Sequence, residues 1–145
     1  MEHVLFVCLH NAGRSQMSEA LFLRAAGGRH EARSAGTTPG DHVHGSVVTV
    51  MREMGIDLSE LKPRLLTTEL AQWADIVITM GCGDSCPVIP GKRYIDWDLT
   101  DPKDLPIDEV RKIRDDIASR VDELVESMSD AENLKFTVGD GGPRR

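Results

Sequence analysis

Cys8 and Arg14 have the residue types and the spacing of a nucleophile in an anion-binding site. An apolar run at residues 3–8 and a helix-forming run at 15–24 flank the five residues between them, so these five should form a loop that enters a helix. Backbone N–H groups of such a loop, together with the helix dipole, can hold a tetrahedral oxyanion. Arg14 can add its two-donor guanidinium, while the same field favours the reactive thiolate form of Cys8, to which the Ser15 hydroxyl can donate. The predicted oxyanion-binding loop consists of Leu9, His10, Asn11, Ala12, Gly13 and Arg14.

Asp101 is the candidate proton donor, and Pro102 follows it directly in a predicted loop. Displacing an oxygen leaving group from a tetrahedral centre requires a proton, which a carboxylic acid near the anion can supply. Because Asp-Pro is also a common turn dipeptide, the assignment of Asp101 depends on its combination with the Cys8 loop.

Cys82 and Cys86 lie in a run of turn-forming residues at 81–87. A polar loop of this kind allows one thiolate to attack another sulfur in line. Cys82 could instead be a core residue at a strand end and Cys86 a loop residue without a role. A metal pair would need further ligands, and His42 with His44 is the only other cluster, so we expect no metal site. Three cysteines without an export signal predict a reducing cytoplasm.

The elements that position these residues alternate between strands and helices. Strands are predicted at 3–8, 31–36, 75–80 and, at an edge, 93–97. Helices are predicted at 15–24 with a stop at Gly27, at 46–54, at 65–73 starting from Thr67 or Thr68, and from 108 onward. Six apolar residues recur along the last helix at spacings of three or four: Val110, Ile113, Ile117, Val121, Leu124 and Met128. This alternation predicts a three-layer α/β/α fold with a four-stranded parallel sheet and right-handed crossovers.

Ligands bind at the carboxyl ends of the strands in such sheets. The loops at 8–14, 82–87 and 98–106 follow strands there, so we expect the candidate residues to meet at one edge of the sheet.

The length and net charge of the chain limit the number of domains and the kinds of partner that we expect. A chain of 145 residues and 16.0 kDa predicts one domain, which we place at 1–133, with a flexible tail at 134–145. The net charge of −7 argues against partners that are nucleic acids or anionic membranes. Residues 108–132 hold nine acidic and four basic residues, so most of this charge lies on the last helix. No apolar run approaches the roughly 20 residues of a membrane span, and we expect a monomer.

These motifs together resemble the low-molecular-weight protein tyrosine phosphatase fold, and within it the arsenate reductases of that superfamily. The resemblance covers about residues 3–130. It depends on the Cys-x5-Arg-Ser loop and the helix opening at 15–20, on Ser34-Ala35-Gly36 after the second strand, on Cys82 after the third strand, and on residues 97–102.

Two substitutions favour a small inorganic oxyanion over a phenyl phosphate. Phosphatases that resemble this chain carry tyrosines after their Asp-Pro and a proline after their Arg-Ser. Here Lys103 and Gln16 occupy those positions, and Tyr94 is the only tyrosine in the chain. The aromatic walls of a phosphotyrosine pocket are therefore not expected.

The resemblance implies a relay of three thiols. Cys8 would attack arsenate, for which phosphate or sulfate would be analogues, Cys82 would then attack Cys8, and Cys86 would take over the disulfide and present it to thioredoxin. Only three residues separate Cys82 from Cys86, fewer than in the thioredoxin-linked relatives. Relatives of actinobacterial type instead use mycothiol with a glutaredoxin-like mycoredoxin, and then Cys8 alone is essential. No bound cofactor is expected in either case.

Two other readings remain open. The chain could be a phosphatase acting on a phosphomonoester, or a thiol-based arsenic or redox sensor, although no DNA-reading helix or basic patch is evident as an output module. Some relatives also bind potassium beside the anion loop. Asn11, Glu19 and Ser34 match that site, but Lys62 and Arg64 stand where further oxygen ligands would be needed, so we expect no potassium.

Overall fold

The computed structural model describes residues 1–81 and 91–140, with side chains described as far as residue 128. Its elements follow one another in the order β1 (His3–Cys8), α1 (Arg14–Ala26), β2 (Glu31–Gly36), α2 (Gly45–Arg52), α3 (Thr68–Trp73), β3 (Ile76–Met80), β4 (Arg93–Asp96) and α4 (Ile107–Asp140).

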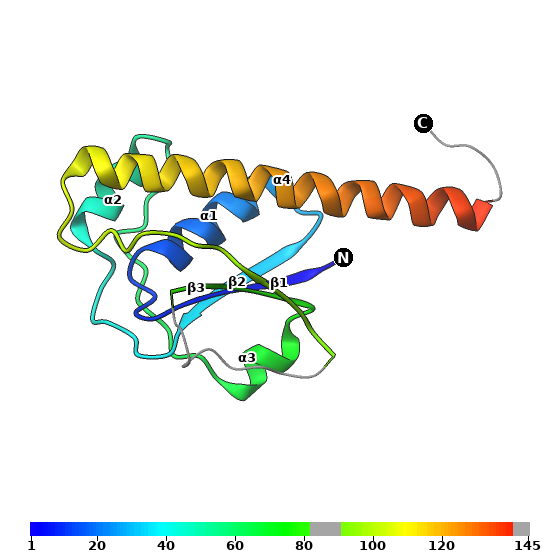
Figure 1. The fold of residues 1–145 in the computed structure, drawn as a ribbon, viewed down its shortest axis with the longest axis horizontal. Helices are drawn as coiled ribbons and strands as arrows, with labels where there is room; N and C mark the ends of the chain where they lie inside the picture. The colour runs from blue at the N-terminus through cyan, green and yellow to red at the C-terminus, as the bar shows by residue number, and fades with distance from the viewer. Residues whose placement is uncertain (82–90, 141–145) are drawn as a thin grey trace.

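The strands form one parallel sheet in the order β2-β1-β3-β4. Helices α1, α2 and α4 cover one face of this sheet and α3 covers the other (Figure 1). The predicted three-layer α/β/α architecture is therefore confirmed, and β4 lies at an edge as expected. Because all strands run the same way, the loops after β1 and β3 leave the sheet at the same edge, as do the residues after β4.

The sheet is buried on both faces, and alternation along β1 divides its side chains between them. Val4, Phe6 and Cys8 join the larger apolar cluster beneath α1 and α4, whereas Leu5 and Val7 join a smaller cluster that includes Leu70 of α3. The thiol of Cys8 therefore lies on the α1 side of the sheet.

Local signals in the sequence set most helix ends. Gly27 ends α1 in a left-handed conformation with φ +56°, and its N–H donates to the Leu23 carbonyl at 3.2 Å. Thr67 caps α3 by accepting a hydrogen bond from the Leu70 N–H at 3.1 Å. Leu65, which the sequence places in that helix, instead forms an isolated bridge with Gly36, because pairing beside the end of β2 holds it in an extended conformation.

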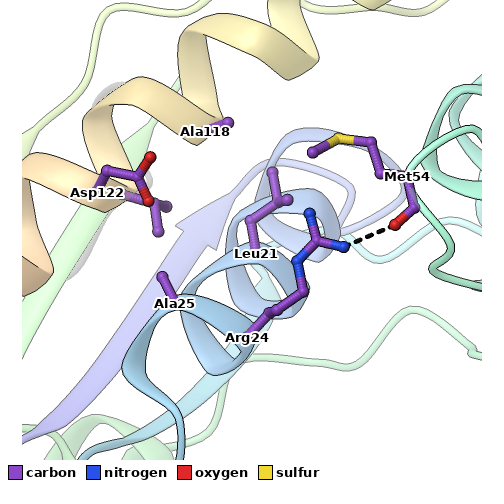
Figure 2. A pocket seen from close by; sticks show the side chains of 7 residues that line it. Leu21, Arg24, Ala25, Met54, Ala118 and Asp122 are labelled. Carbon is purple, nitrogen blue, oxygen red and sulfur yellow. Dashed lines mark hydrogen bonds between the residues drawn. The ribbon is translucent and has the colours of Figure 1, made fainter.

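Helix α4 packs along α1 through the predicted apolar stripe, all six members of which are buried. A small pocket of about 140 Å³ remains between α1 and α4, lined in part by Leu21, Ala25 and Ala118 (Figure 2). Beside it, Arg24 Nη1 donates to the Met54 carbonyl at 2.6 Å. This pocket lies along the C-terminal half of α1, whereas the Cys8 loop joins its N-terminus.

The last helix continues to Asp140, beyond its expected end, and its final turns extend past the rest of the molecule (Figure 1). Residues 134–140 thus have helical backbone where the sequence indicates a tail. Leu134, Lys135 and Phe136 are compatible with a helix, and the first glycine comes only at Gly139. Residues 141–145 lie outside the described residues, and the boundary between a domain and a tail stays a prediction. Within the described part of the chain, no helix is both long and apolar enough to cross a membrane.

Candidate active site

The loop between β1 and α1 is held by backbone hydrogen bonds from the segment 37–44. Carbonyls of the loop accept four N–H groups, and the pairs are Thr37 to Cys8 at 3.3 Å, Thr38 to Leu9 at 2.8 Å, Gly40 to His10 at 3.0 Å and His44 to Ala12 at 2.9 Å. In a trans peptide the N–H points opposite to the carbonyl. The N–H groups of Leu9, His10, Asn11 and Gly13 therefore turn away from segment 37–44, as a cradle for an oxyanion requires.

Two glycines allow neighbouring segments to approach this loop closely. A β-carbon on Gly36 would lie 2.8 Å from the Leu9 carbonyl oxygen, and one on Gly13 would lie 2.9 Å from Cγ of Pro102. Because Gly13 has no side chain, the Asp101-Pro102 dipeptide can pack directly on the predicted anion loop. Leu99, just before this dipeptide, lies 85 residues after Arg14 in the sequence.

The Cys8 thiol is buried, with 2% of the residue exposed. Its Sγ lies 2.9 Å from Ser15 Oγ, and the Asn11 backbone N–H donates to it at 3.3 Å. Asn11 itself has φ +52°, a left-handed conformation that asparagine tolerates better than most residues. The Cys8 sulfur thus has hydrogen-bonding partners on Ser15 and Asn11, and the structure brings these three residues together.

Arg14 and Asp101 meet beside the loop. Arg14 Nη1 donates to the Leu99 carbonyl at 3.2 Å, and its Nη2 lies 3.7 Å from Asp101 Oδ2. The Arg14 side chain is 8% exposed, whereas that of Asp101 is 45% exposed. Asp101 also accepts the backbone N–H of Lys103 at 3.0 Å, which orients its carboxyl group. A fixed cation and a solvent-accessible acid thus lie at the same site.

Three residues at the site receive no role from the sequence alone. Gln16 is buried and bonds to Asn11, Gly81 contacts the Arg14 guanidinium, and His44 Cδ2 lies 3.5 Å from where a Gly13 β-carbon would be. Burial lowers the pKa of His44 below 6.5, against the opposing effect of the Asp101 charge. The position of Gln16 directly after Arg14-Ser15 could have marked it as part of the site. Gly81 and His44 become neighbours of the loop only through folding.

Cys82 and Cys86 lie outside the described residues, so their predicted roles are untested. The last described residue before them in the sequence is Gly81. Gly81 has φ +83°, and a β-carbon there would lie 3.0 Å from Cζ of Arg14. The chain therefore passes the arginine of the anion loop immediately before Cys82.

The residues beside Asn11 do not fit a resident potassium ion. Asn11 Oδ1 already accepts two N–H groups, from Gln16 Nε2 at 3.0 Å and from the Arg64 backbone at 2.9 Å. Ser34 Oγ donates to Glu19 Oε1 at 2.6 Å. The adjoining cavity measures about 30 Å³, and the cationic residues Lys62 and Arg64 line it together with Glu19. Among the residues with described positions, no group of three histidine, cysteine, aspartate or glutamate residues could hold a metal ion.

The family follows from a comparison with known proteins. A model of the low molecular weight phosphotyrosine protein phosphatases matches residues 3–134. The chain belongs to this family. The family resemblance indicated by the Cys8 loop is thereby confirmed.

Relatives within the phosphatase family include several arsenate reductases. A Halobacterium salinarum protein provisionally named as one is 44% identical over 129 residues, which are 86% of this chain and 91% of that protein. The glutaredoxin arsenate reductase of Synechocystis sp. is 31% identical over 132 residues, 89% of this chain and 100% of that one. The structure of the Corynebacterium glutamicum thioredoxin-dependent arsenate reductase matches with a TM-score of 0.77 and 40% identity over 90% of this chain, which spans only 63% of that longer chain.

Proposed function

We propose that this protein reduces arsenate to arsenite, with Cys8 as the nucleophile. The observation that carries the proposal is the arrangement of Cys8 against two hydrogen-bond donors, with Arg14 and Asp101 converging beside the same loop. Such a site can bind a tetrahedral oxyanion, attack its central atom and protonate an oxygen that leaves. The similarity to arsenate reductases and the absence of tyrosines after Pro102 favour arsenate over an aryl phosphate.

The first step forms a bond between Cys8 and arsenic. The Cys8 thiolate attacks arsenate, one arsenic–oxygen bond breaks, and Asp101 gives its proton to the departing oxygen, which leaves as water. Arg14 and the loop N–H groups stabilise the charge on the remaining oxygens. Arsenic stays pentavalent in this adduct.

Two electrons then move from sulfur to arsenic. The Cys82 thiolate attacks Cys8 Sγ, the sulfur–arsenic bond breaks, and its electron pair leaves with arsenic, which becomes arsenite. Cys8 and Cys82 are now joined in a disulfide. Cys86 attacks Cys82 and releases Cys8 as a thiolate, and an external dithiol of the thioredoxin class reduces the resulting Cys82–Cys86 disulfide. This chemistry requires the reducing cytoplasm inferred from the cysteines, and we expect the protein to act as a monomer.

The route of re-reduction has an alternative. A small thiol such as mycothiol could release arsenite directly from the Cys8 adduct, with a mycoredoxin completing the cycle, and then only Cys8 would be essential. The relatives differ in the redox protein that their names give, because one is thioredoxin-dependent and another is a glutaredoxin arsenate reductase.

Arsenate-dependent oxidation of NADPH in the presence of thioredoxin and thioredoxin reductase tests the proposal. Wild type should turn over, whereas Cys8→Ser, Cys82→Ser and Cys86→Ser should not. In a single turnover without reductant, Cys86→Ser should still release one arsenite and accumulate a Cys8–Cys82 disulfide, which peptide mapping detects.

The other outcomes separate the alternatives. Normal turnover of Cys86→Ser with thioredoxin would contradict the three-thiol relay. The small-thiol route would be supported if no protein oxidised NADPH with thioredoxin and wild type released arsenite with mycothiol and mycoredoxin.

A phosphatase is the second candidate, because the whole family is named for that activity. Rapid hydrolysis of p-nitrophenyl phosphate without any arsenate turnover would favour it. We expect the reverse, since Lys103 stands where phosphatases of this fold carry a tyrosine that contacts the phenyl ring.

A further inference from the structure

Gln16 is a buried polar side chain for which the proposed reaction has no use. It is the third residue of α1 and is 4% exposed. Its Nε2 donates to Asn11 Oδ1 at 3.0 Å and to the Lys62 carbonyl at 3.4 Å. A buried amide of this kind is stabilised by its hydrogen bonds, and neither of these two bonds is to the thiol itself.

Backbone groups fix the orientation of both amides. The Arg64 N–H can only donate, so the Asn11 atom that meets it at 2.9 Å must be the oxygen. The Lys62 carbonyl can only accept, so the Gln16 atom that meets it must be the nitrogen. Neither assignment depends on the choice of an amide flip. Gln16 therefore donates to Asn11, and the NH₂ group of Asn11 faces the other way.

That NH₂ group determines how Ser15 is oriented. Asn11 Nδ2 donates to Ser15 Oγ at 2.6 Å, and Ser15 Oγ lies 2.9 Å from Cys8 Sγ. Because Ser15 accepts from Asn11, its single hydroxyl hydrogen is available for the sulfur. The Asn11 backbone N–H also donates to the sulfur. In this series of hydrogen bonds, Gln16 donates to Asn11, Asn11 to Ser15 and Ser15 to Cys8.

We propose that Gln16 is a positioning residue that sets the reactivity of Cys8 through Asn11 and Ser15. It touches neither the sulfur nor the substrate site. Together with the Arg64 N–H it holds the Asn11 amide in the one orientation that directs hydrogen bonds to the thiolate. The inference rests on the proposed role of Cys8 as the nucleophile, but its test needs no arsenate.

The test compares Gln16→Met with Gln16→Glu. Methionine has a similar length but cannot donate, so Asn11 Oδ1 loses one of its two donors. A glutamate carboxylate would place an acceptor against Asn11 Oδ1 and the Lys62 carbonyl, which opposes the observed orientation more strongly. Gln72→Met is the matched control, because Gln72 is exposed on α3. All proteins carry Cys82→Ser and Cys86→Ser, so that Cys8 is the only thiol.

The readout is the rate of Cys8 alkylation by iodoacetamide as a function of pH. At pH 7 we expect Gln16→Met to react roughly tenfold more slowly than the parent, as expected for a weakened hydrogen bond to a charged group, and Gln16→Glu to react more slowly still. At high pH, where any thiol is ionised, the rates should converge. The charged groups Arg14, Asp101 and His44 around the loop, and Glu19, Lys62 and Arg64 beside Gln16, are the same in the parent and in Gln16→Met, so they contribute no difference between those two proteins. Gln16→Glu adds a carboxylate of its own, and Gln16→Met is therefore the deciding variant.

Other outcomes have distinct meanings. Unchanged alkylation at pH 7 in both Gln16 variants, or an equal loss at every pH, would overturn the proposed relay. The latter result would indicate general damage to the loop, which thermal unfolding would also register. If the parent thiol is itself no more reactive at pH 7 than a free cysteine, the proposed nucleophile fails and this inference falls with it.

Discussion

Gly81 and Arg14 are in direct contact: a β-carbon on Gly81 would collide with Nη1 of the Arg14 guanidinium. The same guanidinium donates to the Leu99 carbonyl and lies near Asp101. The end of β3 and the loop before α4 therefore both fix the cation of the anion loop. Gly81 directly precedes Cys82 in the sequence.

Gly81→Ala should abolish most arsenate turnover while leaving the fold intact. The added methyl group must displace Arg14, and a misplaced catalytic group can lower a rate by about 100-fold. Gly55→Ala is the control, since Gly55 has a similar φ of +78° but nothing within 4 Å of a β-carbon. Both variants should lose about 1 kcal/mol of stability from the left-handed backbone, measured by urea unfolding, and Gly81→Ala should lose more because Arg14 must give up its place beside Leu99. Equal activities in the two variants would contradict a role for the Gly81–Arg14 contact.

Asp101→Asn should lower kcat by about 10²-fold or more, because an amide cannot supply the proton for the departing oxygen. Binding of phosphate as a competitive inhibitor should change much less, since Arg14 and the loop N–H groups remain. Steady-state kinetics with arsenate provide the measurement. Asp98→Asn, an exposed aspartate in the same loop, should behave as wild type, and a comparable loss there would argue against proton donation by Asp101.

Glu53→Gln should make stability less dependent on acid pH. Hydrogen bonds from Arg111 and Arg114 lower the pKa of Glu53 from 4.5 to about 2. Since the folded pKa lies below the ordinary value, the ionised carboxylate stabilises the fold above pH 4.5, and this contribution is lost as the pH falls toward 2. Wild type should therefore exceed the variant in unfolding free energy near pH 6, and the difference should vanish near pH 2. Glu60→Gln, an exposed change, should show no such convergence.

Glu19→Gln should stabilise the protein at neutral pH. Burial raises the pKa of Glu19 above 4.5, although the hydrogen bond from Ser34 and the charge of Arg64 oppose the shift. The folded state thus binds the proton more tightly than the unfolded state, and ionisation of Glu19 costs stability as the pH rises through the folded pKa. Urea unfolding should show the variant above wild type at pH 7 and equal to it below pH 4.5. A destabilised variant at pH 7 would mean that the charge pairing with Arg64 outweighs burial.

Arsenate turnover should not depend on potassium. The Asn11 carboxamide oxygen already accepts two N–H groups, so a potassium ion would have to compete with hydrogen bonds that the loop makes for itself. Rates in KCl and in choline chloride at equal ionic strength should agree. A saturable activation by potassium alone would contradict this account of the site beside Glu19.

Much of the site could be predicted because it is local in sequence. Cys8, Asn11, Arg14 and Ser15 lie within eight residues, and a strand followed by a loop and a helix N-terminus has a narrow range of geometries. The apolar stripe of α4 was equally readable, because a period of three to four residues has one interpretation. The residue at which α4 ends could not be predicted in the same way, since helix propensities of single residues are weak.

Long-range contacts could not be read in this way. Nothing near Gln16 in sequence predicts that its amide meets the Lys62 carbonyl, 46 residues away, or that Arg14 meets Leu99, 85 residues away. Leu65 was expected in a helix but pairs with Gly36, because a neighbouring strand end outweighs local propensity.

The sequence by itself therefore determined the loop from Cys8 to Arg14 and the alternation of strands and helices, because these depend on spacing and on local backbone preference. The tertiary structure alone decided how the loop is oriented. Segment 37–44 draws the loop carbonyls to one side, Gly81 and Leu99 fix the arginine, and Lys62 with Arg64 sets the direction of the hydrogen bonds that reach Cys8. The physical reason is that a hydrogen bond has a direction, which is fixed only when both partners have been brought together by the fold.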